Sequence, residues 1–457
     1  MMDTATAARV VHGRLIGANL HFARVSTDTR SLGAGDLYVA LKGERFDGHD
    51  FVAAALAQGA VAALIAADRT HSLRGELIAV NDPLTALGEL AAYWRRQFAI
   101  PVIVIVGSNG KTTVKEMLAS VLRTHFGADA VLATRGNLNN AIGLPLTLLE
   151  LRALHRVAVI ELGMNHSGET AELAAIAQPT VAIVNNAQRE HQEFMNNLAE
   201  VAAEHAALVR ALSADGIAVL NADDANVNVW RDAARTGIVN VEFALDHAAD
   251  TRGSYTPAAG GGVLELMTPR GNATVRLAAP GRHNASNALA ATAAALAIGV
   301  PLDAIVSGLE AFRPVAGRLV ARHGRHGAII IDDSYNANPD SVRAAIDVLA
   351  LMPGAKWLAL GDMGEVGREG PAFHREIGGY ARTAGIDRLL TTGSLAAESA
   401  AAFGAGAEHF ESVDALAAHV ADVARAGTTV LVKGSRFMRM ERVVATLTGD
   451  SDSGGPH

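Results

Sequence analysis

The sequence predicts an α/β protein of three domains, built around mostly parallel β-sheets. Short β-branched runs alternate with alanine-rich segments along the chain, which is the pattern of strands and helices in such folds. The 457 residues allow about two to four domains at roughly 150 residues each. Half of the residues are hydrophobic and 19% are charged, so the chain can bury large cores and is not globally disordered.

Composition excludes several classes of protein. Acidic residues outnumber basic ones by 47 to 39 and no basic arm is present, which argues against a general nucleic-acid binder. The chain contains no cysteine, so disulfides and thiolate metal sites are excluded. The first residues carry no apolar signal core, and the most apolar stretch, 288–300, is too short to span a bilayer. We therefore expect a soluble, cytoplasmic protein that neither binds nucleic acid nor inserts into membranes.

The pattern divides the chain into three domains and a polar tail. The expected stretches are 1–97, 98–313, 314–450 and, for the tail, 451–457. The first domain is a small α/β unit whose closing helix is expected at 83–98, after strands at 36–41 and 62–66. The tail is rich in glycine and serine and has no reason to order.

The second, central domain is predicted to contain a parallel sheet. Its first strand, VIVIV at 102–106, is continuously apolar and must be covered on both faces. Further strands are expected at 157–160 and 181–184, edge hairpins between about 250 and 280, and a long alanine-rich helix at 284–298.

The third domain is predicted to be Rossmann-like, because strands and helical segments alternate through it. The expected strands lie at 328–331, 357–360, 388–391 and 429–432, with a helix at 339–351. In open parallel sheets, ligands bind at the carboxyl ends of the strands. Polar residues directly after strands are therefore the candidates for function.

A glycine-rich loop after the 102–106 strand has the features of a phosphate-binding loop. It comprises Gly107, Ser108, Asn109, Gly110, Lys111, Thr112 and Thr113. Its glycines let backbone N–H groups face a polyphosphate, the following helix favours negative charge, and Lys111 neutralises the β- and γ-phosphate oxygens. The hydroxyl of Thr112 is placed to bind Mg²⁺. The spacing is two residues shorter than the usual motif, and the alternative is a strand–helix turn with a surface lysine.

Three later strand ends carry unusual polar residues. Glu161 follows the 157–160 strand and is the expected second Mg²⁺ contact, with an exposed loop acid as the alternative. His191 is either a further ligand or a hydrogen-bonded loop histidine. The Asp332 and Asp333 pair either takes part in a site or caps the helix that follows.

These motifs resemble those of the Mur ligases, the ATP-dependent amide-forming enzymes of peptidoglycan synthesis. The shared segments are GSNGKTT (107–113), ELGMNHSGE (161–169), PGRHNASNALAA (280–291), GR (317–318) and KGSR (433–436). Other segments are closer to the branch that joins a dipeptide to a UDP-linked tripeptide: ALKGERFDGHDF, GNLNNAIGLPLTLL, NNAQREHQEFM, DDSYNANPDS and LGDMGEVG. The resemblance runs in order through all three domains.

The resemblance implies a reaction. ATP would phosphorylate the terminal carboxylate of UDP-N-acetylmuramoyl-tripeptide, and the amine of D-alanyl-D-alanine would attack the acyl phosphate, in a monomeric enzyme that uses ATP and Mg²⁺. It also implies an ATP site split between two domains, which close around it and exclude water. The alternatives are a sister ligase that adds the third peptide residue, a folylpolyglutamate-synthase-like ligase, and a phosphate-loop ATPase that drives movement or regulates a partner.

The resemblance also assigns residues, with Lys111, Glu161 and His191 as the catalytic group. The residues implied for ATP and its metal ions are Lys111, Thr112, Glu161, His191, Asn284, Asn287, Arg318 and Asp333. The residues implied for UDP are Ser26, Thr27, Arg30, Lys42, Asp47 and His49. The residues implied for the muramoyl peptide and the dipeptide are Asn139, Asn140, Asn336, Lys433, Ser435 and Arg436. Without the resemblance, 26–30 is a plain turn and 433–436 a loop that faces solvent.

The chain departs from the family at one metal ligand. Many Mur ligases carry a carbamylated lysine in the central domain, but this chain has no lysine between Lys115 and Lys356. The corresponding stretch is 200–208, where Glu204 or His205 takes its place or nothing does. The alternative for His205 is an ordinary position on the surface of a helix.

Overall fold

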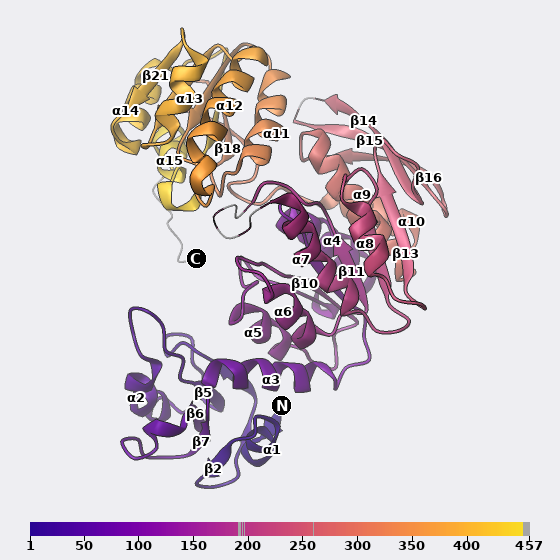
Figure 1. The fold of residues 1–457 in the computed structure, drawn as a ribbon, viewed down its shortest axis with the longest axis vertical. Helices are drawn as coiled ribbons and strands as arrows, with labels where there is room; N and C mark the ends of the chain where they lie inside the picture. The colour runs from indigo at the N-terminus through magenta and orange to yellow at the C-terminus, as the bar shows by residue number, and fades with distance from the viewer. Residues whose placement is uncertain (191–192, 194, 196, 259, 451–457) are drawn as a thin grey trace.

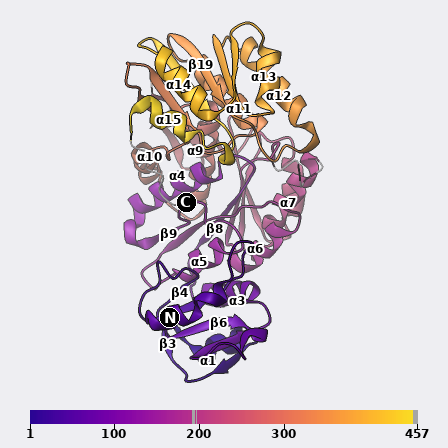
Figure 2. The same ribbon diagram turned by 90° about the vertical axis from the view of Figure 1, so that its left-hand side faces the viewer.

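The computed structural model describes residues 1–190, 193, 195, 197–258 and 260–450. Three α/β domains are stacked along the long axis, with the N-terminal domain at one end and the C-terminal domain at the other (Figures 1 and 2). The predicted fold class is confirmed. The predicted tail, 451–457, lies outside the described residues. Within the described part of the chain, no helix has the length and apolar character needed to cross a membrane.

The first domain contains a five-stranded sheet and a two-stranded one. The larger sheet has the order β2 (Arg14–Ile16), β7 (Leu77–Val80), β6 (Ala62–Ala66), β5 (Asp36–Val39) and β4 (Arg24–Ser26), and β1 (Met2–Asp3) pairs with β3 (His21–Phe22). Its helices are α1 (Thr4–Val10), α2 (Val52–Ala57) and α3 (Pro83–Arg95). Helix α3 starts where Asp82 accepts hydrogen bonds from two backbone N–H groups, and Pro83 suits the first turn.

Helix α3 also joins the first domain to the second. The Trp94 indole N–H donates to the carbonyl of Leu151 at 3.0 Å, and the buried Arg95 guanidinium donates to the carbonyls of Ala177 and Gln178 at 3.2 Å. Apolar side chains of both domains form one continuous core around this helix. The two domains are therefore packed together rather than linked loosely.

The second domain contains a nine-stranded sheet. Its order is β16 (Gly271–Leu277), β15 (Gly261–Thr268), β14 (Thr251–Ala258), β13 (Val239–Ala244), β12 (Ile217–Asn221), β11 (Val181–Val184), β8 (Val102–Val106), β10 (Val157–Glu161) and β9 (Val131–Ala133). In this order, the strands from β14 across to β9, with β8 among them, run parallel to one another. The predicted hairpins form the antiparallel edge. All five residues of β8 are buried, as its apolar run predicts.

Helices cover both faces of this sheet. On one face lie α4 (Lys111–Phe126), α9 (Arg282–Ala297) and α10 (Leu302–Ala311), packed on Ile103 and Ile105 of β8. On the other lie α5 (Gly143–Leu149), α6 (Glu169–Ala177), α7 (Leu198–Arg210) and α8 (Val227–Ala233), packed in the core that holds Val102, Val104 and Val106. Alternate side chains of one strand thus serve two separate cores.

The third domain contains a six-stranded sheet. Its order is β17 (Val320–His323), β18 (Ile329–Asp333), β22 (Thr428–Lys433), β19 (Ala355–Leu360), β20 (Arg388–Thr392) and β21 (Ala407–Phe410), with only β17 antiparallel among these. The helices are α11 (Pro339–Ala350), α12 (Gly370–Thr383), α13 (Ala396–Phe403), α14 (Val413–Val423) and α15 (Glu441–Thr448). The alternative that Asp332 and Asp333 cap α11 is wrong, because Asn338 and Ser341 form the capping box.

Candidate active site

A cavity of about 1260 Å³ lies between the second and third domains. Its walls are the phosphate loop, the end of β10, the start of α9 and the loop between β18 and α11. The phosphate loop and the end of β10 meet because the parallel strands β8 and β10 end at the same edge of one sheet, and the third domain presents the end of its own parallel strand β18 to the same cavity. The cavity therefore sits at the place where the strand pattern predicts a ligand.

The phosphate loop has the predicted backbone. Gly107 and Gly110 adopt positive φ angles of 146° and 82°. A Cβ at Gly107 would lie 2.9 Å from the Asn185 Cβ, and one at Gly110 would lie 2.4 Å from the Asn287 Oδ1. Only glycine fits both the angles and the space, so the loop can bring its N–H groups close to a ligand.

Lys111 lies inside the cavity. Its side chain is 14% exposed, and its Nζ donates to the carbonyl of Gly107 at 2.5 Å and lies 3.4 Å from the Glu190 carboxylate. The alternative of a surface lysine on an ordinary turn is therefore wrong. An ammonium held by the carbonyls of Gly107 and Ser108 and by one carboxylate is positioned to exchange that carboxylate for a phosphate.

The third domain reaches the phosphate loop directly. Arg318 donates from Nη2 to the Thr112 hydroxyl at 3.0 Å, and its guanidinium stacks over the Tyr335 ring at 4.3 Å. At the ends of the paired strands β18 and β22, the Lys433 Nζ lies 2.6 Å from the Asp333 carboxylate. Residues that the resemblance assigned to ATP from two domains thus meet in one cavity.

The 433–436 segment divides between the interior and the surface. Lys433 and Ser435 are 3% and 4% exposed, and the Ser435 hydroxyl donates to the carbonyl of Ala337 at 3.0 Å. The alternative of a solvent-facing loop is wrong for these two residues. Arg436 is half-exposed and pairs with Glu441 at 3.1 Å. Of the segment, only Lys433 lies among the residues described as lining the cavity.

Glu161 is the last residue of β10 and is 3% exposed, so the alternative of an exposed loop acid is wrong. Its Oε1 accepts a hydrogen bond from the Asn139 side-chain amide at 2.8 Å. Its Oε2 lies 3.5 Å from the Lys115 Nζ and has no hydrogen-bond donor among the described residues. The Glu161 Oε2 can therefore accept a further ligand, and it shares the cavity with the Thr112 hydroxyl. Oxygen atoms are the ligands that Mg²⁺ prefers, so these two residues fit a Mg²⁺ site.

Lys115 was not among the site residues expected from the sequence. It is fully buried, and its Nζ also lies 3.2 Å from the Glu116 carboxylate and donates to the carbonyl of Gly136 at 3.4 Å. The signal was present in the sequence, because Lys115 stands four residues after Lys111 and the two share one helix face.

The candidates for the missing lysine have other surroundings. Glu204 accepts the backbone N–H groups of Gly168 and Thr170 at the start of α6. His205 is 1% exposed, so the alternative of a helix-surface position is wrong. Neither is among the residues described as lining the cavity. His191 lies outside the described residues.

The adenine candidates lie in the first turns of α9. Asn287 accepts from the Asn185 side-chain amide at 2.9 Å and donates to the Asn284 Oδ1 at 3.2 Å. His283 lines the cavity beside them, and burial together with the charge of Lys433 lowers the pKa of His283 to about 4. This imidazole is therefore neutral near pH 7.

Replacing His283 with asparagine should flatten the acid dependence of stability. Between pH 6.5 and 4 the unfolded chain binds a proton at His283 that the folded chain does not, so folding free energy is lost as the pH falls through this window. Urea unfolding at pH 7.0 and 4.5 should show wild type losing about 2 kcal/mol more than the variant. Equal losses in the two proteins would refute the lowered pKa.

The candidates for UDP lie in the first domain, apart from this cavity. The Ser26 hydroxyl bonds to the backbone of Asp28, and Arg30 pairs with the Asp28 carboxylate at 2.7 Å. The Asp47 carboxylate contacts the His49 Nδ1 at 2.5 Å and the guanidinium of Arg69 at 2.6 Å. None of Ser26, Thr27, Arg30, Lys42, Asp47 and His49 lines the described cavity, whereas Asn139, Asn140 and Asn336 do.

Comparison with known proteins gives three consecutive family matches. Residues 21–95 match the Mur ligase family catalytic domain, 105–295 the Mur ligase middle domain and 317–436 the Mur ligase glutamate ligase domain. These matches lie in the three domains described above.

Full-length relatives agree with these matches. UDP-N-acetylmuramoyl-tripeptide–D-alanyl-D-alanine ligase of Escherichia coli strain K12 is 42% identical over 96% of both chains. A crystal structure of MurF from Acinetobacter baumannii superposes with a TM-score of 0.91 at 34% identity, covering 98% of this chain and 99% of that one. MurF from Thermotoga maritima in complex with ADP gives 0.84 at 27% identity, covering 93% and 97%. With all three domains matched and a relative this similar over nearly its whole length, the chain belongs to the Mur ligase family.

Proposed function

We propose that this chain joins D-alanyl-D-alanine to UDP-N-acetylmuramoyl-tripeptide, with ATP converted to ADP and phosphate. The observation that carries the proposal is the contact between Arg318 and Thr112, which assembles one phosphate site from two domains. The relatives above supply the substrate class, because the Escherichia coli protein is named for this ligation and the Thermotoga maritima structure holds ADP.

The chemistry requires activation of a carboxylate. A carboxylate repels nucleophiles and its oxide is a poor leaving group, so a carboxylate oxygen first attacks the γ-phosphorus and ADP departs. The amine of the dipeptide then attacks the acyl carbon, the nitrogen loses a proton, and phosphate leaves as the amide forms. Positioning of the reactants and neutralisation of the phosphate charge are the enzyme's main contributions.

The residues of the cavity can perform these tasks. Lys111 and the N–H groups at the start of α4 bind the phosphates, and Arg318 approaches the same oxygens from the third domain. Thr112 and Glu161 would hold Mg²⁺, which supplies charge neutralisation for the transferred phosphoryl group. Asn139 orients the Glu161 carboxylate through its hydrogen bond. His191 stays a predicted further ligand.

The domains divide the substrates among them. Residues 1–97 bind the UDP portion through the segments that hold Arg30 and His49, and residues 98–313 bind ATP. Residues 314–450 complete the phosphate site and accept the dipeptide near Lys433. Asn284 and Asn287 take the adenine, because they present amide groups at the start of α9 within the same cavity.

Continued turnover of ATP should require all three substrates, because without the dipeptide the reaction stops at the acyl phosphate after the first ADP departs. Purified protein is incubated with ATP and Mg²⁺, adding the tripeptide substrate and D-alanyl-D-alanine singly and together, and the product is identified by mass spectrometry. Parallel reactions with tripeptides ending in lysine and in meso-diaminopimelate establish which is accepted. ATP hydrolysis that is independent of both substrates would exclude the ligase and favour a phosphate-loop ATPase.

A further inference from the structure

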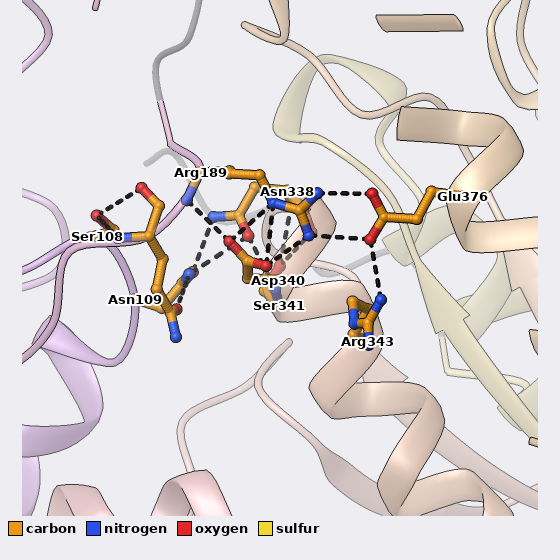
Figure 3. Close-up of polar contacts among 9 residues, drawn as sticks. Ser108, Asn109, Arg189, Asn338, Asp340, Ser341, Arg343 and Glu376 are labelled. Atoms are coloured by element: carbon orange, nitrogen blue, oxygen red, sulfur yellow. Dashed lines mark hydrogen bonds and ion pairs between the residues drawn. The ribbon is translucent and has the colours of Figure 1, made fainter. Parts of the chain in front are cut away.

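One arginine of the second domain binds two carboxylates of the third. Arg189 lies between β11 and α7, and its Nη2 is 2.6 Å from the Asp340 Oδ1 while its Nη1 is 2.7 Å from the Glu376 Oε2 (Figure 3). Its backbone N–H also donates to the Asp340 Oδ2 at 2.8 Å. The guanidinium lies 5.2 Å from the centre of the Phe373 ring.

The ion pairs of Arg189 with Asp340 and Glu376 are partly shielded from solvent, and both carboxylates have further support within the third domain. The three side chains are only 20% to 34% exposed, so solvent screens them less than it screens an ordinary surface pair. Asp340 lies in the first turn of α11, where a negative charge is favoured by the helix dipole. Glu376 lies on α12 and is also bound by Arg343 at 3.0 Å, a contact made within the third domain.

The same region of α11 contacts the phosphate loop. Asn109 and Asn338, the cap of α11, exchange side-chain hydrogen bonds of 2.9 and 3.3 Å. Asn109 also donates to the Gln188 Oε1 at 2.7 Å, and the Gln188 N–H donates to the Ser108 hydroxyl at 2.9 Å. The segment that carries Arg189 is therefore bonded to the phosphate loop on one side and to α11 on the other.

The neighbour of Arg189 in the chain bears on the reaction. Glu190 is the carboxylate that lies 3.4 Å from the Lys111 Nζ. Arg189, which binds α11, and Glu190, which faces Lys111, are adjacent in the chain. Docking of α11 therefore fixes the position of the residue next to the one that faces the phosphate-binding lysine. The third domain, through Arg318, contacts the residue after that lysine.

We infer that Arg189 is a positioning residue that holds α11 of the third domain on the phosphate loop and so aligns Arg318 with Lys111 and Thr112 for phosphoryl transfer. The inference rests on the proposed function for its catalytic consequence, whereas the docking itself does not. Removing the guanidinium takes from Asp340 the cation that it binds in Figure 3, whereas Glu376 keeps its contact with Arg343. Misplacement of groups by about 1 Å can reduce a rate by about 10²-fold.

The test uses Arg189→Met with Arg343→Met as its matched control. Both substitutions remove an arginine that binds Glu376, but only the first breaks a contact between domains. Because the chain has no cysteine, Asp129→Cys and Glu411→Cys supply two unique positions for fluorescent labels, one exposed on each domain. Energy transfer between the labels, with and without ATP, reports how closely the domains are docked.

We expect Arg189→Met to lower the fraction of molecules in which the second and third domains are docked. It should also reduce kcat about 10- to 100-fold, with a smaller change in the KM for ATP. Arg343→Met should change each quantity less than threefold. Arg189→Lys should keep part of the docked fraction, because the lysine ammonium retains the positive charge but lacks the planar guanidinium that can bind two carboxylates at once. A further cycle with Glu376→Gln should be non-additive with Arg189→Met.

Two outcomes would overturn the inference. Unchanged energy transfer and kcat in Arg189→Met would show that the pairing does not position the domains. Equal losses in Arg189→Met and Arg343→Met, with similar thermal unfolding, would show a general effect of charge at Glu376. Failure of the proposed function is separate, since wild type would then make no amide while the energy-transfer comparison still measures docking.

Discussion

Replacing Lys111 with methionine is expected to reduce amide formation by about 10³-fold. The Nζ of Lys111 lies among loop carbonyls and the Glu190 carboxylate, where the phosphates of ATP are expected. Without the ammonium, Glu190 repels the nucleotide and the charge that develops during phosphoryl transfer loses a fixed counter-charge. Lys115 cannot take its place, because its Nζ is buried against Glu161 and Glu116.

The measurement is product formation by mass spectrometry, with circular dichroism to check that the fold is intact. Lys356→Met is the control, since Lys356 lies at the start of β19 and is absent from the described cavity lining. It should retain wild-type activity. Turnover of Lys111→Met within tenfold of wild type would contradict the assignment of the phosphate loop.

Replacing Glu161 with glutamine should reduce kcat by about 10²- to 10³-fold and raise the Mg²⁺ concentration needed for half-maximal activity. Glutamine keeps an oxygen that can accept from Asn139, but it removes the buried negative charge. Isothermal titration of Mg²⁺ with ADP present measures metal binding without turnover. Unchanged Mg²⁺ binding would contradict the role of Glu161 as a ligand.

The same substitution should lower the free energy of unfolding. Breaking a buried ion pair costs about 3–5 kcal/mol, and the remaining contact of Lys115 with Glu116 should reduce that loss. Adding Lys115→Met should recover stability in urea unfolding without recovering activity. Glu116→Gln serves as the control, because it removes the other partner of Lys115 but does not touch the described cavity.

The elements predicted from the sequence are those whose patterns are local. The apolar run of β8, the hairpins of the 250–280 region and the alanine-rich helix α9 all appear within a few residues of their expected bounds. Strands β12 and β13 were not predicted, and neither was the order of the sheet. Strand order depends on pairing between distant segments, and no local period records it.

Part of the site was also readable from the sequence. The phosphate loop was predicted from its own residues, since glycine backbone freedom and helix dipole act over a few positions. Arg318 was assigned only through resemblance, whereas Asp333 was already a candidate at the end of a strand and the resemblance added its role toward ATP. The structure brings both to the cavity. The burial of Lys115 and its approach to Glu161 were not predicted, because they depend on how α4 packs beside β10.

The three-domain α/β organisation, the phosphate loop and the motifs of the Mur ligases can all be read from the order of the residues. Those features depend on residue types and on spacings of a few positions. Which charges meet depends instead on how the folded chain packs: Lys115 lies beside Glu161, Lys433 beside Asp333, and Arg189 beside Asp340, which is 151 positions away in the chain. Such pairs form when packed domains bring distant segments within a few ångströms, and the free energy that selects them belongs to the whole fold.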